Sequence, residues 1–201
     1  MKKEEYELVC PSCKIINLKL NLESYFCEKC KFVYKIKNNF PILINFDLEK
    51  INYKEEDILF VNKILKKNNL KEKIINFIYG VSEITRQNSK IFLNELKKNN
   101  LNKVLIIGGA SQGSGTELLM NSDNISITSV DKIATKNVNY IADAHYLPFK
   151  DETFDGVWIQ AVLEHVISPI KVVDEIYRIL KKKWIRLCRN AFYATNSYGK
   201  R

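Results

Sequence analysis

Residues 101–131, LNKVLIIGGASQGSGTELLMNSDNISITSVD, decide the fold of the larger part of this chain. They read as a buried apolar strand that runs into a glycine-rich turn, then a short helix, then a second apolar strand. Residues 137–143 (NVNYIAD) and 154–161 (FDGVWIQA) have the composition of a third and a fourth strand, and residues 168–182 that of an amphipathic helix. This alternation predicts an α/β domain with a parallel, doubly wound sheet.

Glycines and acids gather where these strands end. The turn after the first strand holds Gly108, Gly109, Gly113 and Gly115, the second strand ends at Asp131, and the third ends at Asp143. Ligands of open α/β sheets collect at the carboxyl ends of the strands, where glycines let main-chain amides approach closely. An acid in the position of Asp131 can accept hydrogen bonds from ribose hydroxyls, although a helix cap or turn residue is the plainer reading of it. Asp143 is placed to bind an adenine amino group.

Four cysteines near the N-terminus form a second constellation. Cys10 and Cys13 are separated by two residues, as are Cys27 and Cys30, and thirteen residues lie between the pairs. Two such knuckles can direct four thiolates at one tetrahedral Zn²⁺, which leaves no open coordination position, so we expect a structural zinc ribbon over residues 1–47. Two disulfides, a redox pair and an iron–sulfur site are the alternatives. A region this short has too little core to fold without help from the metal.

Residues 48–100 have a different pattern, with apolar residues three and four positions apart. This spacing predicts amphipathic helices that link the ribbon to the α/β domain or cap it. Within this segment Ile84, Ile91, Leu93 and Leu96 are the expected core-facing stripe. In the helix at 168–182, we expect Ser168 as the N-cap, a buried face, and an ion pair between Asp174 and Arg178. That buried face would consist of Ile170, Val173, Ile176, Tyr177 and Leu180.

Composition excludes several classes of protein. The chain has 201 residues and a net charge of +9, of which the last 21 residues supply seven charges without any acid. We therefore read the basic balance as a solvated surface rather than a nucleic-acid footprint. No apolar run reaches the roughly 18 residues of a membrane span, and no secretory signal is recognised, so we expect a cytoplasmic protein.

The larger domain resembles a known enzyme family. The stretches VLIIGGASQGSGTELL, ITSVDK, IADAHYLPFKDETFDGVWIQAVLEHV and VVDEIYRILKK are similar, in order, to the motifs of class I S-adenosylmethionine-dependent methyltransferases of the type 11 group. The resemblance covers roughly residues 101–183. The N-terminal cysteine region resembles small zinc-ribbon proteins that partner methyltransferases, and the ribbon fused to some ribosomal-RNA methyltransferases.

The resemblance implies a cofactor and the residues that bind it. Gly108, Gly113 and Gly115, with Gly109, would lie against the methionine and ribose of S-adenosylmethionine. Asp131 would hold the ribose, Asp143 and Ala144 the adenine, and residues from Gln160 to His165 would line the pocket. The sequence departs from the family at Ile106, where an acid is frequent, and at Ala110, where a second glycine is expected. No catalytic residue is predicted, and we expect His165 simply to begin a helix.

The C-terminal end does not continue the pattern. The family's fold needs further strands after the helix that ends near Lys183, and the sequence KKKWIRLCRNAFYATNSYGKR does not supply them. A shift of one nucleotide at the Lys-Lys-Lys run would turn the junction into a glycine codon, the residue expected there. We therefore expect residues from about 183 onward to be a frameshift product, the fold to be incomplete, and the chain as written to be poorly stable and inactive.

The sequence thus predicts methyl transfer from S-adenosylmethionine by a Rossmann-like domain at 101–201, preceded by a zinc ribbon and a helical segment. The acceptor could be a small molecule, a glycan, RNA or a protein, with no membrane partner expected, and the oligomeric state is open. Two rivals are an NAD-binding Rossmann oxidoreductase, whose glycine fingerprint fits poorly, and a non-enzymatic zinc-ribbon adaptor with an inactive half-domain.

Overall fold

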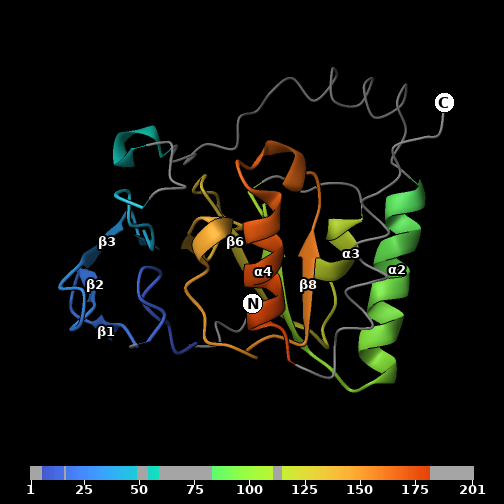
Figure 1. Cartoon of the computed structure of the whole chain (residues 1–201). Coiled ribbons are helices and arrows are strands. Elements are labelled where there is room, and N and C mark those ends of the chain that lie inside the picture. The colour runs from blue at the N-terminus through green and yellow to red at the C-terminus, as the bar shows by residue number, and fades with distance from the viewer. Residues whose placement is uncertain (1–5, 16, 49–53, 59–82, 111–114, 182–201) are drawn as a thin grey trace.

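The computed structural model describes residues 6–15, 17–48, 54–58, 83–110 and 115–181. These residues form two sheets, an antiparallel one near the N-terminus and a parallel one in the larger domain (Figure 1). Three expectations fall outside the described residues, and they stay predictions. They concern most of the helical segment at 48–100, Gly113, and the tail from about 183.

The N-terminal sheet is a small antiparallel unit with the strand order β1-β2-β3-β4. Its strands are β1 Lys19–Leu20, β2 Ser24–Phe26, β3 Val33–Lys37 and β4 Phe40–Pro41. The two residues between β3 and β4, Asn38 and Asn39, both have positive φ angles, 53° and 66°. This is the two-residue hairpin turn whose twist matches the strands that flank it, and asparagine tolerates its conformation well. The expected β-rich N-terminal region is confirmed.

The second sheet is parallel and has the order β7-β6-β5-β8. Its strands are β5 Lys103–Ile107, β6 Ser126–Asp131, β7 Tyr140–Ile141 and β8 Gly156–Ile159. In chain order this is third, second, first, fourth, the arrangement of a doubly wound sheet, whose ligand-binding crevice opens beside the first strand. The predicted α/β class and all four predicted strands are confirmed, although β7 keeps only two of its seven expected residues.

Helices cover both faces of the parallel sheet. Among the described residues these are α2 Glu83–Lys98, the short α3 Thr116–Met120 and α4 Pro169–Ile179. Three 3₁₀ turns are also present: η1 Glu55–Asp57, which contacts β3, η2 Ala144–Tyr146 and η3 Leu163–His165. Val104 and Ile106 of β5 pack with Phe92 of α2, whereas Leu105 and Ile107 lie in the cluster that contains Ile176 of α4. Successive residues of a strand point to opposite faces, so the continuous apolar run of β5 serves both layers.

The buried faces of α2 and α4 differ from those that the sequence predicts. In α2 the predicted Leu96 is buried, but Ile91 is 52% exposed and Phe92, which was not predicted, is buried; the side chain of Ile84 lies outside the described residues. In α4 the predicted Ile170 and Tyr177 are exposed. The predicted Ile176 and Leu180 are buried, and Val173 is half-buried. Beyond the predicted face, α4 also buries Val172, Glu175 and Ile179. The buried face of α4 therefore includes Glu175, a charged residue of a type that is usually exposed to solvent.

The ion pair and the cap predicted for α4 also need correction. Arg178 pairs with Glu175, at 2.9 Å from Nε to Oε1, and with Asp151. Ser168 is the N-cap residue of α4, as predicted, but its side chain makes no capping hydrogen bond. The reason for the changed partner is that Glu175 is buried, and a buried carboxylate needs a close cation more than an exposed one does.

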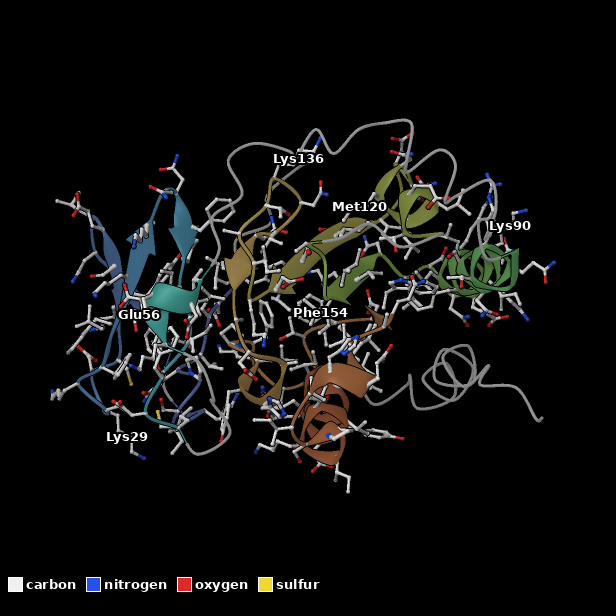
Figure 2. All side chains as sticks on the ribbon, turned by 90° about the horizontal axis from the view of Figure 1, so that it is seen from above. Lys29, Glu56, Lys90, Met120, Lys136 and Phe154 are labelled. Atoms are coloured by element: carbon white, nitrogen blue, oxygen red, sulfur yellow. The ribbon has the colours of Figure 1, made fainter. Side chains whose placement is uncertain are left out.

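The N-terminal sheet and the parallel sheet share one hydrophobic core. The segment after β4 runs parallel to β7, where the Leu43 amide donates to the carbonyl of Ile141 at 2.8 Å. Leu8 pairs antiparallel with Phe149, and the Val9 amide donates to the Pro148 carbonyl at 3.1 Å. Figure 2 shows the N-terminal sheet at one end of the molecule and α2 at the other. The chain thereby covers the β7 edge, which would otherwise expose unpaired backbone groups.

The opposite edge of the parallel sheet is β8, the outermost strand within the described part of the chain. Its side chains Val157 and Trp158 are each only 5% exposed, because helices cover the two faces. Among the helices that the structure describes, none combines the length and apolar character needed to cross a bilayer.

Candidate functional site

A cavity of about 340 Å³ opens at the carboxyl ends of the parallel strands. Its walls come from the ends of β5, β6 and β8, from the turn after β7, and from residues 165–167 before α4. Of the predicted site residues, those that line it are Gly108, Asp131, Asp143, Ala144 and Gln160. The predicted edge of the sheet is therefore the edge that carries the cavity, as the fold requires of a doubly wound sheet.

The turn after β5 is built so that only glycine fits. Gly108 has a φ of 83°, and a Cβ added there would lie 2.4 Å from Cγ2 of Val162. Gly109 packs on β6, where a Cβ would lie 1.8 Å from the Ser129 hydroxyl oxygen. Gly115 has a φ of 90° and is the N-cap of α3, in close approach to Ser89 of α2. Gly108 lines the cavity. At positions 109 and 115 glycine is required because neighbouring residues leave no room for a Cβ.

Replacing Gly108 by alanine should destabilise the domain by about 2 kcal/mol or more, since it combines a left-handed backbone with a steric overlap. Urea unfolding measures the change. The control is Ala161→Gly on the same wall of the cavity, where Ala161 has a φ of 53°. A glycine adopts this conformation without strain, so the free energy of unfolding of the Ala161→Gly protein should stay within about 1 kcal/mol of that of the parent. Equal stabilities of the Gly108→Ala protein and the parent would contradict this description of the turn.

Asp131 is held against the glycine turn. One carboxylate oxygen accepts a hydrogen bond from the Ala110 amide at 2.9 Å, and the other accepts from the Ile133 amide at 3.0 Å. The carboxylate therefore ties the end of β6 to the end of β5 and stands on the wall of the cavity. Each carboxylate oxygen has a second lone pair, so both can still accept from a ligand hydroxyl.

His145 completes the turn after β7, and the sequence did not single it out. Asp143 accepts from the His145 amide at 2.7 Å, and its Oδ1 lies 2.5 Å from Nδ1 of the His145 ring. The Ser168 amide donates to Nε2 of the same ring at 3.2 Å. Because Nε2 accepts, the ring proton is on Nδ1 and is donated to Asp143. His145 is 3% exposed, so it fixes Asp143 and links the turn to the start of α4.

The segment after β8 forms the remaining wall. Gln160 Oε1 accepts from the Thr116 hydroxyl at 3.5 Å, which places Gln160 beside the start of α3. Ala161 follows with a positive φ, a conformation that costs a non-glycine residue about 1–3 kcal/mol and that is concentrated at functional sites. His165 lines the cavity too, at the end of the 3₁₀ turn η3. No sequence pattern marks Ala161.

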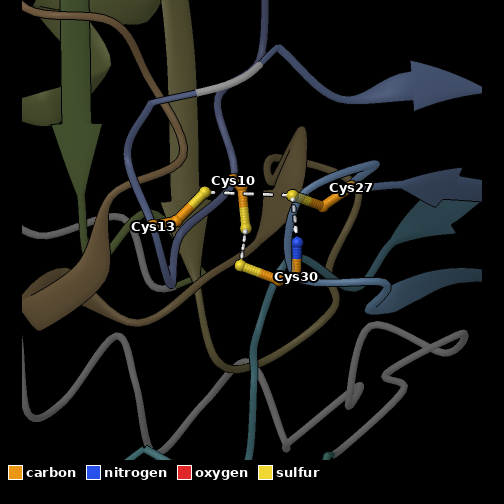
Figure 3. Close-up of side chains that lie close together, drawn as sticks. All are labelled: Cys10, Cys13, Cys27 and Cys30. Carbon is orange, nitrogen blue, oxygen red and sulfur yellow. Dashed lines mark hydrogen bonds between the residues drawn. The ribbon is translucent and has the colours of Figure 1, made fainter.

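The four cysteines meet at the N-terminal sheet, with their sulfur atoms directed at one point (Figure 3). Cys13 and Cys27 Sγ are 3.8 Å apart, Cys10 and Cys30 Sγ are 4.0 Å apart, and all four lie within 4.8 Å of one another. Sulfur atoms around a tetrahedral zinc, at about 2.3 Å from the metal, are about 3.8 Å apart. The donor set fits Zn²⁺, and these distances exceed the roughly 2 Å of a disulfide bond.

The surroundings of the thiols also suit a metal. The buried Tyr34 hydroxyl lies 3.2 Å from Cys10 Sγ and 3.2 Å from the Ser12 hydroxyl. Such a second layer orients metal ligands. Desolvation, followed by the neighbouring thiols, raises the pKa of Cys30 to about 12. Binding of Zn²⁺ would supply a cation and release the thiol protons.

A buried ionic cluster lies between the ribbon and the cavity. Glu175 of α4 accepts from Lys14 Nζ at 2.6 Å, from the Leu147 amide at 2.7 Å, and from Arg178 at 2.9 Å. Burial alone would raise the pKa of Glu175, but the hydrogen bonds and charges of Arg178 and Lys14 hold it below its usual value. Glu175 is therefore an ionised, fully paired carboxylate. Sequence reasoning missed this cluster, because its members are far apart along the chain.

Comparison with known proteins finds a matching family and similar relatives for part of the chain. Residues 109–184 match the family described as "Methyltransferase domain". The ubiquinone/menaquinone biosynthesis C-methyltransferase of Pectobacterium atrosepticum is 36% identical over 76 residues, which is 34% of this chain and 30% of that protein. An uncharacterized protein of Methanocaldococcus jannaschii is 43% identical over 60 residues, 30% of this chain and 26% of that one. The chain thus spans less than a third of the length of these curated relatives.

Solved structures with a similar arrangement include two methyltransferases. An S-adenosylmethionine-dependent methyltransferase of Thermotoga maritima is 25% identical, with a TM-score of 0.35, over 56% of this chain and 53% of that chain. Another, from Aquifex aeolicus, is 19% identical, with a TM-score of 0.33, over 45% of this chain and 58% of that chain.

Proposed function

We propose that this chain, which carries a methyltransferase domain at residues 109–184, binds S-adenosylmethionine in the cavity at the carboxyl ends of its parallel strands. One observation carries the proposal. The main chain of the glycine turn and the carboxylate of Asp131 converge, with Ala110 N and Asp131 Oδ2 2.9 Å apart, on the same cavity that Asp143 and Ala144 line. Its volume, about 340 Å³, lies within the range of small-molecule sites.

The roles of the residues follow from their positions. Asp131 would accept hydrogen bonds from the ribose hydroxyls, and Asp143 with Ala144 would contact the adenine. Gly108 would let the methionine part pass close to the main chain, while Gly109 and Gly115 keep the turn in place. Gln160 would close the side next to α3. The assignment of Gly113 rests on the sequence alone.

The proposed reaction is methyl transfer to an acceptor. The sulfonium of the bound cofactor makes the methyl carbon electrophilic, so the protein's main contribution is to hold the two reactants in line. We assign no general base, and the acceptor class stays open among small molecules, glycans, RNA and proteins. In the ribbon, Cys10, Cys13, Cys27 and Cys30 would hold a structural zinc, because four thiolates leave no position for a substrate.

Ligand-dependent thermal unfolding tests the proposal and separates it from the rival NAD-binding oxidoreductase. S-adenosylhomocysteine, the demethylated product, should stabilise the zinc-loaded chain by about 2.7 kcal/mol at a hundred times its dissociation constant, whereas NAD at equal concentration should not. Binding needs only the cavity, so the test does not depend on turnover. Stabilisation by NAD alone, or by neither ligand at millimolar concentration, would overturn the proposal.

A further inference from the structure

The loop after residues 143–145 of the cavity is fixed by hydrogen bonds between its main chain and charged side chains. Asp143, Ala144 and His145 line the cavity, and Leu147 to Phe149 follow immediately. The Leu147 amide donates to Glu175 at 2.7 Å, and its carbonyl accepts from Lys14 Nζ at 2.7 Å and from Arg178 at 3.0 Å. The position of the turn at 143–145 therefore depends on a buried cluster of three charges.

Lys14 is the member of this cluster that comes from the ribbon. It ends the first cysteine knuckle, where its amide donates to the Cys10 carbonyl at 2.9 Å and its φ is 58°. Its side chain leads away from the sulfur cluster to the larger domain, where Nζ donates to Glu175 and to the Leu147 carbonyl. Only 23% of the side chain is exposed.

The second knuckle supplies an internal comparison. Lys31 occupies the equivalent position, with the same φ of 58° and an amide that donates to the Cys27 carbonyl at 2.8 Å. Its side chain, however, is on the surface, above the ring of Phe26. The two knuckles are thus alike in backbone and differ in what their lysines contact. The contact of Lys14 with the cavity loop is not a by-product of the knuckle geometry.

We propose that Lys14 is a positioning residue through which the metal-bound knuckle holds the turn at 143–147, so that zinc binding by the ribbon sets the affinity of the cavity for S-adenosylmethionine. The proposal rests on the proposed function for its ligand. A ribbon of this size relies on its metal to stay folded. Without the metal, the knuckle no longer holds Lys14, the Leu147 carbonyl loses one of its donors, and the cavity turn is less well ordered before the ligand arrives.

The test compares Lys14→Met with Lys31→Met in the zinc-loaded full chain. Three quantities are measured: zinc per chain, hydrogen exchange of residues 143–149 without ligand, and affinity for S-adenosylhomocysteine by calorimetry. Lys14→Met should retain one zinc, exchange faster at Leu147, and bind the ligand about tenfold more weakly. Lys31→Met should match the parent in all three. An unchanged Lys14→Met protein, or an equal loss in Lys31→Met, would overturn the proposal.

Two further measurements keep the outcomes distinct. If Lys14→Met loses its zinc, Glu175→Gln tests the same link from α4 with the ribbon intact, and unchanged exchange and affinity in that variant would also overturn the proposal. If the parent chain binds no S-adenosylhomocysteine, the proposed function fails. The positioning role is then judged by hydrogen exchange at Leu147, where equal rates in Lys14→Met and the parent would reject it.

Discussion

Replacing Cys27 by serine should abolish zinc binding and lower the midpoint of thermal unfolding of the whole chain by roughly ten degrees or more. Cys27 is fully buried, and its sulfur is 3.8 Å from that of Cys13. A serine hydroxyl is a poor ligand for zinc beside three thiolates, so the site loses both a ligand and a charge. Atomic emission spectroscopy and calorimetry measure the two effects.

The effect reaches beyond the ribbon because the hydrophobic core is continuous. Cys10, Cys27 and Tyr34 belong to the same buried cluster as Leu105 of β5 and Ile176 of α4. Unfolding of the ribbon would therefore expose part of the core of the parallel sheet and the backbone edge of β7.

The matched control is Lys29→Ser, in the same knuckle but exposed. It should retain zinc and unfold within about 2 degrees of the parent, as expected for an exposed site without special contacts. Two separate unfolding transitions in the parent chain, with only the smaller one lost in Cys27→Ser, would contradict the single shared core.

Local patterns were sufficient to predict the elements and the edge on which the site lies. The run KVLII marks a strand buried on both faces, and Gly108 and Asp131 line a cavity at the edge of the sheet that the sequence indicated. Likewise, the spacing of Cys10, Cys13, Cys27 and Cys30 alone indicated that their sulfurs meet. These features depend on neighbours in sequence, or on the rule that parallel strands end at one edge.

Features that depend on long-range pairing were not predictable in this way. The buried face predicted for α4 did not include Glu175, and two of its predicted members, Ile170 and Tyr177, are exposed. The structure buries Glu175 because Lys14, 161 residues earlier, and Arg178 neutralise it. The same holds for the β7 edge, which pairs with Leu43 from the ribbon. Nothing in the sequence of either segment shows which partner it meets.

Replacing Asp131 by asparagine should weaken S-adenosylhomocysteine binding about a hundredfold, the largest effect we expect from a single side chain of the cavity. Both carboxylate oxygens accept from main-chain amides, those of Ala110 and Ile133. An asparagine offers one oxygen and one NH₂ group, so one of these amides would face a donor. The turn would lose one of its links to β6, and the ribose hydroxyls would lose a charged acceptor.

The control for this substitution is Asp123→Asn, an exposed acid before β6. It removes the same charge from the chain while leaving the cavity intact, so its affinity should equal that of the parent. Calorimetry gives the affinities, and zinc content together with circular dichroism shows that both variants are folded. A folded Asp131→Asn protein that binds as tightly as the parent would remove Asp131 from the site. Since the turn and the carboxylate define the cavity together, the assignment of the ribose position would then have to be abandoned.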